Sequence, residues 1–111
     1  MPMQTPSTDT LARLEATIAA RRTAAPESSY VAQLYARGLP VIARKLGEEA
    51  VEAAIAAIAQ GREEVVGEAA DVIFHLLVLL RARDIPLADV LAELDRREGV
   101  SGLDEKAART E

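Results

Sequence analysis

Apolar residues recur at three- and four-residue intervals along most of the chain, the spacing that places side chains on one face of a helix. No stretch shows the alternation typical of strands. The breaks between the apolar stripes coincide with proline, glycine and serine, which cap or interrupt helices. We therefore predict an all-α protein with helices at about 8–21, 29–38, 40–60, 62–83 and 86–98.

The two longest predicted helices are separated by Gly61, so they have to fold back on each other as a central antiparallel hairpin. The second of them is apolar almost all round, which is typical of a buried helix. In its interior, Glu68, Asp71 and His75 form one narrow polar stripe at helical spacing. Because one small chain cannot cover this much apolar surface, we expect these helices to need a partner chain.

Composition and charge narrow the class of protein. The 111 residues fit one domain, expected at 8–98 between a flexible tail at 1–7 and a frayed tail at 99–111. The net charge of −5 argues against a nucleic-acid partner, and the lack of cysteine excludes disulfides and thiolate metal sites. The N-terminus lacks a signal-peptide core and no apolar run is long enough to span a bilayer, so we expect a cytoplasmic protein without a membrane partner.

Acidic residues gather on both helices of the predicted hairpin. Glu48, Glu49 and Glu52 share one side of the first helix, and Glu68 and Asp71 share one side of the second. Counted from the turn glycine, Glu52 and Glu68 differ in height by only about 3 Å along the helix axes. The hairpin therefore brings four carboxylates together, at Glu49, Glu52, Glu68 and Asp71. Oxygen ligands without cysteine suit Mg²⁺, with Mn²⁺ as a substitute.

Each acidic patch alone has a plainer interpretation. A Glu-Glu-x-x-Glu motif is common on solvated helices, and the stripe of Glu68 and Asp71 also suits a polar seam at a subunit interface. The two patches lie at matching heights across one tight hairpin, and this conjunction favours metal binding over surface charge.

Polar residues beside the acidic patches are candidates for catalysis. Glu48 can orient or activate a water beside a bound metal ion, with metal ligation as its alternative role. Lys45 can neutralise negative charge on a ligand of that metal, the alternative being an ion pair with Glu48 or Glu49. For Arg44 such an ion pair is the simpler explanation. His75, the only histidine, either donates to a ligand carboxylate or is a satisfied interface residue.

The motif GEEAVE at 47–52, followed by EAAD at 68–71, resembles the signature of the all-α nucleoside triphosphate pyrophosphatases, which include MazG-like enzymes and dimeric dUTPases. Further features are similar to the phosphoribosyl-ATP pyrophosphohydrolase family within that group. They are Ser29-Tyr30, the basic pair Arg44-Lys45 and the run EAADVIFHLLVLL at 68–80. The resemblance covers about residues 11–97. Phe74 stands where that family often has Tyr, and Val51 where Thr is frequent.

This resemblance implies a homodimeric enzyme, with the helices of two chains in one helical bundle, that uses Mg²⁺ to hydrolyse phosphoribosyl-ATP to phosphoribosyl-AMP and pyrophosphate, the second step of histidine biosynthesis. It also implies contacts of Ser29 and Tyr30 with the phosphate or ribose of the substrate, although helix capping explains Ser29 equally well and Tyr30 also suits a core position. We count Arg44 and His75 among the further candidate substrate contacts.

Two alternatives compete with this function. A housecleaning nucleoside triphosphate pyrophosphatase of the MazG or dUTPase type would share the metal site and differ only in its base and ribose pocket. A non-catalytic helical dimer used as a scaffold would show no dependence on Mg²⁺.

Overall fold

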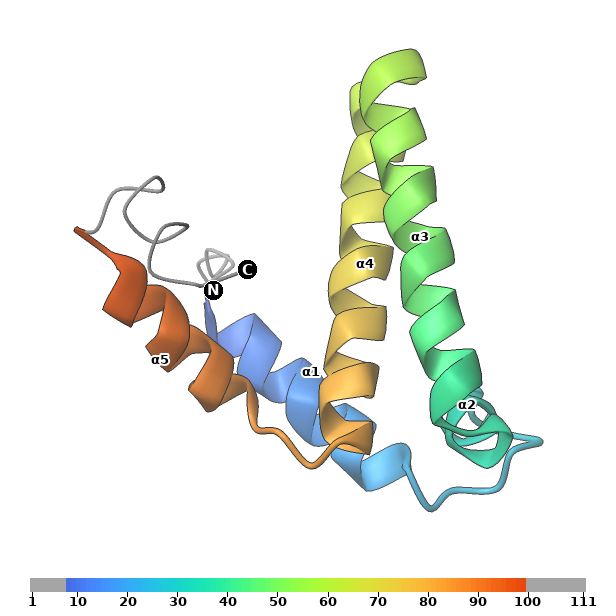
Figure 1. Ribbon diagram of the computed structural model, residues 1–111. Coiled ribbons are helices and arrows are strands. Elements are labelled where there is room, and N and C mark those ends of the chain that lie inside the picture. The colour runs from blue at the N-terminus through green and yellow to red at the C-terminus, as the bar shows by residue number, and fades with distance from the viewer. Residues whose placement is uncertain (1–7, 100–111) are drawn as a thin grey trace, which may run out of the picture.

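The computed structural model describes residues 8–99, and every regular element in that range is a helix (Figure 1). The helices are α1 (Thr8–Arg21), α2 (Tyr30–Arg37), α3 (Leu39–Ala59), α4 (Arg62–Ala82) and α5 (Leu87–Arg97). The all-α prediction is therefore confirmed. The predicted tails, at 1–7 and 99–111, lie outside the described residues except for Gly99. None of the described helices is long and apolar enough to cross a membrane.

Local chemistry sets the boundaries of the two helices that precede the turn. Ser29 caps α2, because its Oγ accepts a hydrogen bond from the backbone N–H of Ala32 at 3.2 Å. Gly38 then separates α2 from α3 with a φ of +95°, a conformation that favours a residue without a Cβ. Helix α3 begins at Leu39, one residue earlier than predicted, since Pro40 needs no N–H partner anywhere in the first turn.

Helices α3 and α4 form the predicted antiparallel hairpin and lie side by side along most of their length (Figure 1). Only Gln60 and Gly61 connect them. The backbone N–H of Gly61 donates to Oε1 of Glu64 at 3.0 Å, which satisfies a group at the start of α4. Ala56 on α3 is completely buried, and a small side chain there allows the two helices to approach closely.

The hydrophobic core lies at one end of this hairpin, where α1 and α2 pack against it. Its buried members are Ile18, Val31, Leu34, Ile42, Leu77, Val78, Leu80 and Leu87. They come from all five helices, but only from the start of α3 and the end of α4, so the turn end of the hairpin projects beyond the core. The Cα radius of gyration of 16.3 Å accordingly exceeds the value of about 13 Å expected for a compact chain of this length.

We predict that Leu34→Ala lowers the free energy of unfolding by about 2–5 kcal/mol, because the substitution leaves a cavity in the core. Leu34 is only 1% exposed. Urea unfolding at a fixed protein concentration measures the loss. Leu94→Ala is the matched control on α5, where Leu94 is 55% exposed, and it should change stability by only about 0.5 kcal/mol. Equal losses of unfolding free energy in Leu34→Ala and Leu94→Ala would show that Leu34 does not lie in the hydrophobic core.

Candidate metal centre

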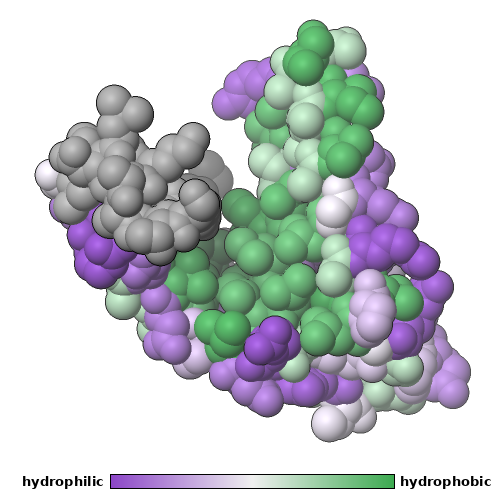
Figure 2. Space-filling model, in the orientation of Figure 1, coloured by the Kyte–Doolittle hydropathy of each residue, from purple (hydrophilic) through white to green (hydrophobic). Residues whose placement is uncertain are grey.

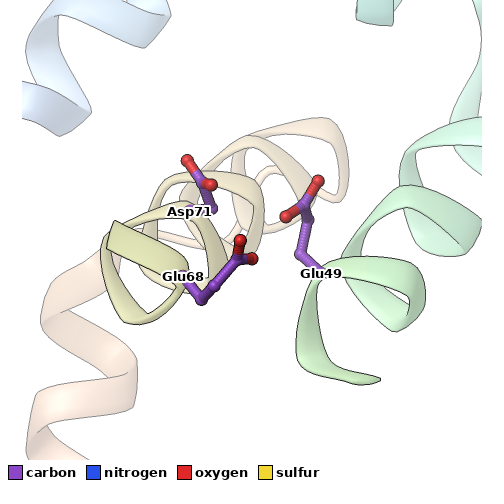
Figure 3. Close-up of side chains that lie close together, drawn as sticks. All are labelled: Glu49, Glu68 and Asp71. Atoms are coloured by element: carbon purple, nitrogen blue, oxygen red, sulfur yellow. The ribbon is translucent and has the colours of Figure 1, made fainter. Parts of the chain in front are cut away.

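Three carboxylates converge between the two helices of the hairpin. Glu49 extends from α3, and Glu68 and Asp71 extend from successive turns of α4 (Figure 3). One oxygen from each of the three lies within 4.8 Å of the others. The geometry follows from the sequence, because the two-residue turn fixes the heights of the helices and the three-residue spacing puts Glu68 and Asp71 on one face.

Glu68 is the most constrained member of this carboxylate cluster. Its Oε2 is buried and has no hydrogen-bond partner within residues 8–99. Burial raises the pKa of Glu68 above its usual value, and the negative charges of Glu52, Asp71 and Glu49 raise it further. A buried carboxylate oxygen without a partner is costly, so the cluster has the charge and the free lone pairs that a cation would satisfy.

Glu52 lies at the edge of the cluster rather than within it. Its side chain is exposed and is not one of the three whose oxygens lie within 4.8 Å of one another. Its charge still acts on the carboxyl group of Glu68, where it is the largest of the neighbouring charge effects. The structure thus brings three of the four predicted metal ligands together and leaves the fourth close by.

The carboxylate of Glu48 forms ion pairs with two basic side chains of its own helix. Its Oε1 lies 3.7 Å from Nζ of Lys45, and its Oε2 lies 3.7 Å from Nε of Arg44. The intrahelical ion pair considered for both basic residues is therefore present. Because these side chains are partly or largely exposed, each pair is worth only a few tenths of a kcal/mol and leaves the charges available to another partner.

His75 is buried, and both of its ring nitrogens have partners. Nδ1 lies 2.7 Å from the backbone oxygen of Asp71, and Nε2 lies 3.0 Å from the hydroxyl of Tyr30. A carbonyl oxygen only accepts, so Nδ1 donates to Asp71, while Nε2 and the hydroxyl of Tyr30 share the second hydrogen bond. His75 thus contacts the backbone of Asp71 rather than a ligand carboxylate, and the partners of both ring nitrogens agree with the alternative of a satisfied histidine.

The start of α2 meets α4 beside the carboxylate cluster. Ser29 is buried there and its hydroxyl caps α2, which confirms the capping interpretation of this residue. The ring of Tyr30 stacks on Phe74, with centroids 6.0 Å apart. Phe74 was noted in the sequence only as a position where the family often has Tyr, because it lies on a helix that is apolar almost all round. Its position three residues after Asp71 was a second clue.

The residues of the cluster fit a hard divalent cation. All of its donor atoms are carboxylate oxygens on two helices, and Glu68 contributes one that lacks any partner in the described chain. None of the ion pairs within residues 8–99 involves Glu49, Glu68 or Asp71. Oxygen-only donor sets of this kind are typical of Mg²⁺ and Mn²⁺ sites.

These features define an all-α protein with a candidate divalent-cation site between two antiparallel helices. Residues 11–98 match the phosphoribosyl-ATP pyrophosphohydrolase family. Proteins named phosphoribosyl-ATP pyrophosphatase are similar over nearly their whole length. The protein from Erythrobacter litoralis is 69% identical, and the match covers 91% of this chain and 97% of that protein. The protein from Rhizorhabdus wittichii is 68% identical, with 92% of this chain and 96% of that protein covered. The protein from Zymomonas mobilis is 57% identical, with 93% of this chain and 96% of that protein covered. The chain therefore belongs to the phosphoribosyl-ATP pyrophosphohydrolase family.

This membership confirms the family resemblance predicted from the motifs at 47–52 and 68–80. It also decides among the alternatives, since the relatives are named as enzymes acting on phosphoribosyl-ATP. Neither a broader nucleoside triphosphate pyrophosphatase nor a non-catalytic scaffold is supported by the comparisons.

We predict that the stability of the metal-free protein falls as pH rises above the usual pKa of a glutamate. The raised pKa of Glu68 means that the folded state binds more protons than the unfolded state in this window, so deprotonation favours unfolding. Glu68→Gln removes this contribution and should flatten the pH dependence of the free energy of unfolding. Urea unfolding in the presence of a chelator, from about pH 4 to pH 8, measures it.

Glu63→Gln is the matched control for this comparison. Glu63 is exposed in the first turn of the same helix, and its substitution should leave the pH dependence unchanged. If the free energy of unfolding depended on pH in the same way in the wild type and in Glu68→Gln, the pKa of Glu68 would not be raised in the folded protein.

Proposed function

We propose that this chain hydrolyses the α–β phosphoanhydride of phosphoribosyl-ATP, in a reaction that requires Mg²⁺ or Mn²⁺. The products are phosphoribosyl-AMP and pyrophosphate, as in the second step of histidine biosynthesis. The observation that carries the proposal is the carboxylate cluster of Glu49, Glu68 and Asp71 in a chain of this family. Family membership supports the substrate, and the cluster supports the place where the phosphates are held.

The same cluster would hold the cation. Glu49, Glu68 and Asp71 are the proposed ligands, and Glu52 is the fourth carboxylate that can join them from the edge. Bound there, Mg²⁺ supplies Lewis-acid polarisation of the phosphate oxygens. The rigid positions of the ligands on two packed helices keep the three carboxylates in place before the substrate arrives.

The reaction balances with one water molecule. The oxygen of water forms a bond to the α-phosphorus, the bond from that phosphorus to the α–β bridging oxygen breaks, and pyrophosphate leaves with the electron pair. Glu48 is the proposed acceptor that orients this water and takes its proton. Lys45, held beside Glu48, is proposed to neutralise phosphate charge, and Arg44 adds positive charge from the same turn.

We predict that Glu49→Gln and Asp71→Asn each lower kcat/KM by about 100-fold or more, a loss of about 2.7 kcal/mol of transition-state stabilisation. Both substitutions remove a ligand charge while keeping the shape of the side chain. Pyrophosphate release from phosphoribosyl-ATP, measured over a range of Mg²⁺ concentrations, tests the effect. Glu63→Gln is the control and should keep the wild-type rate.

Full Mg²⁺-dependent turnover by both ligand variants would exclude this metal site. ATP and dUTP, assayed under the same conditions, test the choice of substrate. A preference of the wild-type protein for either nucleotide over phosphoribosyl-ATP would contradict the proposed reaction while leaving the metal site intact.

We also propose that the protein is a homodimer, because both helices of the hairpin carry apolar residues on the sides turned away from each other. On α3, Val51, Ile55 and Ile58 fall within an arc of about 60° whose centre is about 130° from the side of buried Ala56. Ile58 is 89% exposed. Figure 2 shows hydrophobic residues extending from the hollow beside α4 along the hairpin. A second copy of the hairpin would bury this surface, as exposed apolar patches commonly require.

We predict that Ile55→Glu shifts the protein from dimer to monomer, because it places a charge in the middle of the exposed apolar stripe on α3. Sedimentation equilibrium over a range of protein concentrations measures the association. Ala57→Glu adds the same charge to an exposed position about 100° away from Ile58 on that helix and should remain dimeric. A monomeric wild-type protein, or a dimeric Ile55→Glu variant, would refute this interface.

A further inference from the structure

The ring of Tyr30 is an aromatic surface that is fixed in place and yet open to solvent. Tyr30 is 47% exposed although it is the first residue of α2 and packs against α4. Phe74 stacks against the ring at 6.0 Å with an interplanar angle of 23°. His75 meets the ring edge at 5.9 Å and binds the hydroxyl at 3.0 Å. The ring is therefore held from one side and at its tip.

The two residues that hold this ring adjoin the carboxylate cluster on α4. Phe74 and His75, which hold it, follow Asp71 by three and four residues and so lie on the same side of α4, one helical turn of about 5.4 Å further along. His75 contacts the backbone oxygen of Asp71 at 2.7 Å, so the residue that binds the hydroxyl of Tyr30 also contacts the turn of α4 that carries a cluster residue. In a nucleotide a ribose separates the α-phosphate from the base, so a base can lie beyond the cluster on this side.

We propose that Tyr30 is the stacking surface for the purine base of the substrate, a specificity-determining role that rests on the proposed function. A nucleotide whose phosphates are held at Glu49, Glu68 and Asp71 would place its base within reach of this ring. Stacking of a base on an aromatic side chain gives a substantial share of nucleotide affinity. Since Phe74 and His75 already immobilise the ring, little conformational freedom is lost when a base binds.

The alternative is that Tyr30 packs for structural reasons alone. The hydroxyl of Tyr30 and one face of its ring do serve the contact between α2 and α4. A purely structural tyrosine would contribute equally to every ligand, with or without a base. The proposed role instead requires a contribution that only the base can receive.

Calorimetric titration in the presence of Mg²⁺ separates these roles without any turnover. One ligand is an ATP analogue with a methylene group in place of the α–β bridging oxygen, and the other is inorganic tripolyphosphate, which lacks the base. Tyr30→Leu should weaken binding of the analogue by about tenfold or more and leave tripolyphosphate binding unchanged. Tyr30→Phe keeps the ring and should retain the affinity for the analogue.

Tyr35→Phe is the matched control, because Tyr35 is the only other tyrosine and its hydroxyl donates to the backbone oxygen of Val78 away from the cluster. Equal losses for the two ligands in Tyr30→Leu, or no loss for either, would overturn the proposal. So would a wild-type protein that binds the analogue no better than tripolyphosphate. A change in association state without a change in base selectivity would assign Tyr30 to the contact between subunits and likewise overturn it.

Failure of the stacking role and failure of the proposed function remain distinguishable. Pyrophosphate release from phosphoribosyl-ATP by the wild-type protein tests the function, whereas the ratio of the two affinities tests Tyr30. Loss of base selectivity in Tyr30→Leu without turnover of phosphoribosyl-ATP by the wild type would retain the stacking surface and reject the substrate.

Discussion

Repulsion among three carboxylates whose backbones are held close together is the constraint on which the rest of this structure depends. Glu49 is attached to α3 and Glu68 and Asp71 to α4, and these two helices are joined by a two-residue turn and pack along most of their length. Their side chains can rotate, but the backbone positions that bring the three charges to one place are set by the hairpin. The repulsion is therefore built into the fold, and a bound dication would stabilise the protein and prepare the site in the same step.

The position of the core explains how so small a chain presents such a site. Side chains from all five helices bury one another at the base of the hairpin, and the part of the hairpin nearest the turn projects beyond them. This arrangement leaves the carboxylate cluster accessible to a ligand. It also leaves apolar residues such as Ile55 and Ile58 uncovered, so the proposed dimer interface and the proposed active site have one structural origin.

The contact between α2 and α4 gives the site its second component. The cap at Ser29 sets the first turn of α2 and so the position of Tyr30, which reaches His75 and through it the backbone of Asp71. Hydrogen bonds and aromatic packing thus connect a short helix to the turn of α4 that carries a proposed ligand. The proposed surfaces for the phosphates and the base of a nucleotide thus come from α2, α3 and α4, and successive turns of α4 connect them.

The sequence by itself determined the helices, the hairpin and the meeting of acidic patches, because each depends on local periodicity, on glycine and proline, and on the length of one turn. Only the tertiary structure decided which acids converge: Glu49 faces α4, while Glu52, about 60° further round α3, stays at the edge. It likewise joined Tyr30 to His75 across 45 positions of sequence. The rotation of one helix against another and the pairing of distant segments follow from side-chain packing, which no local pattern contains.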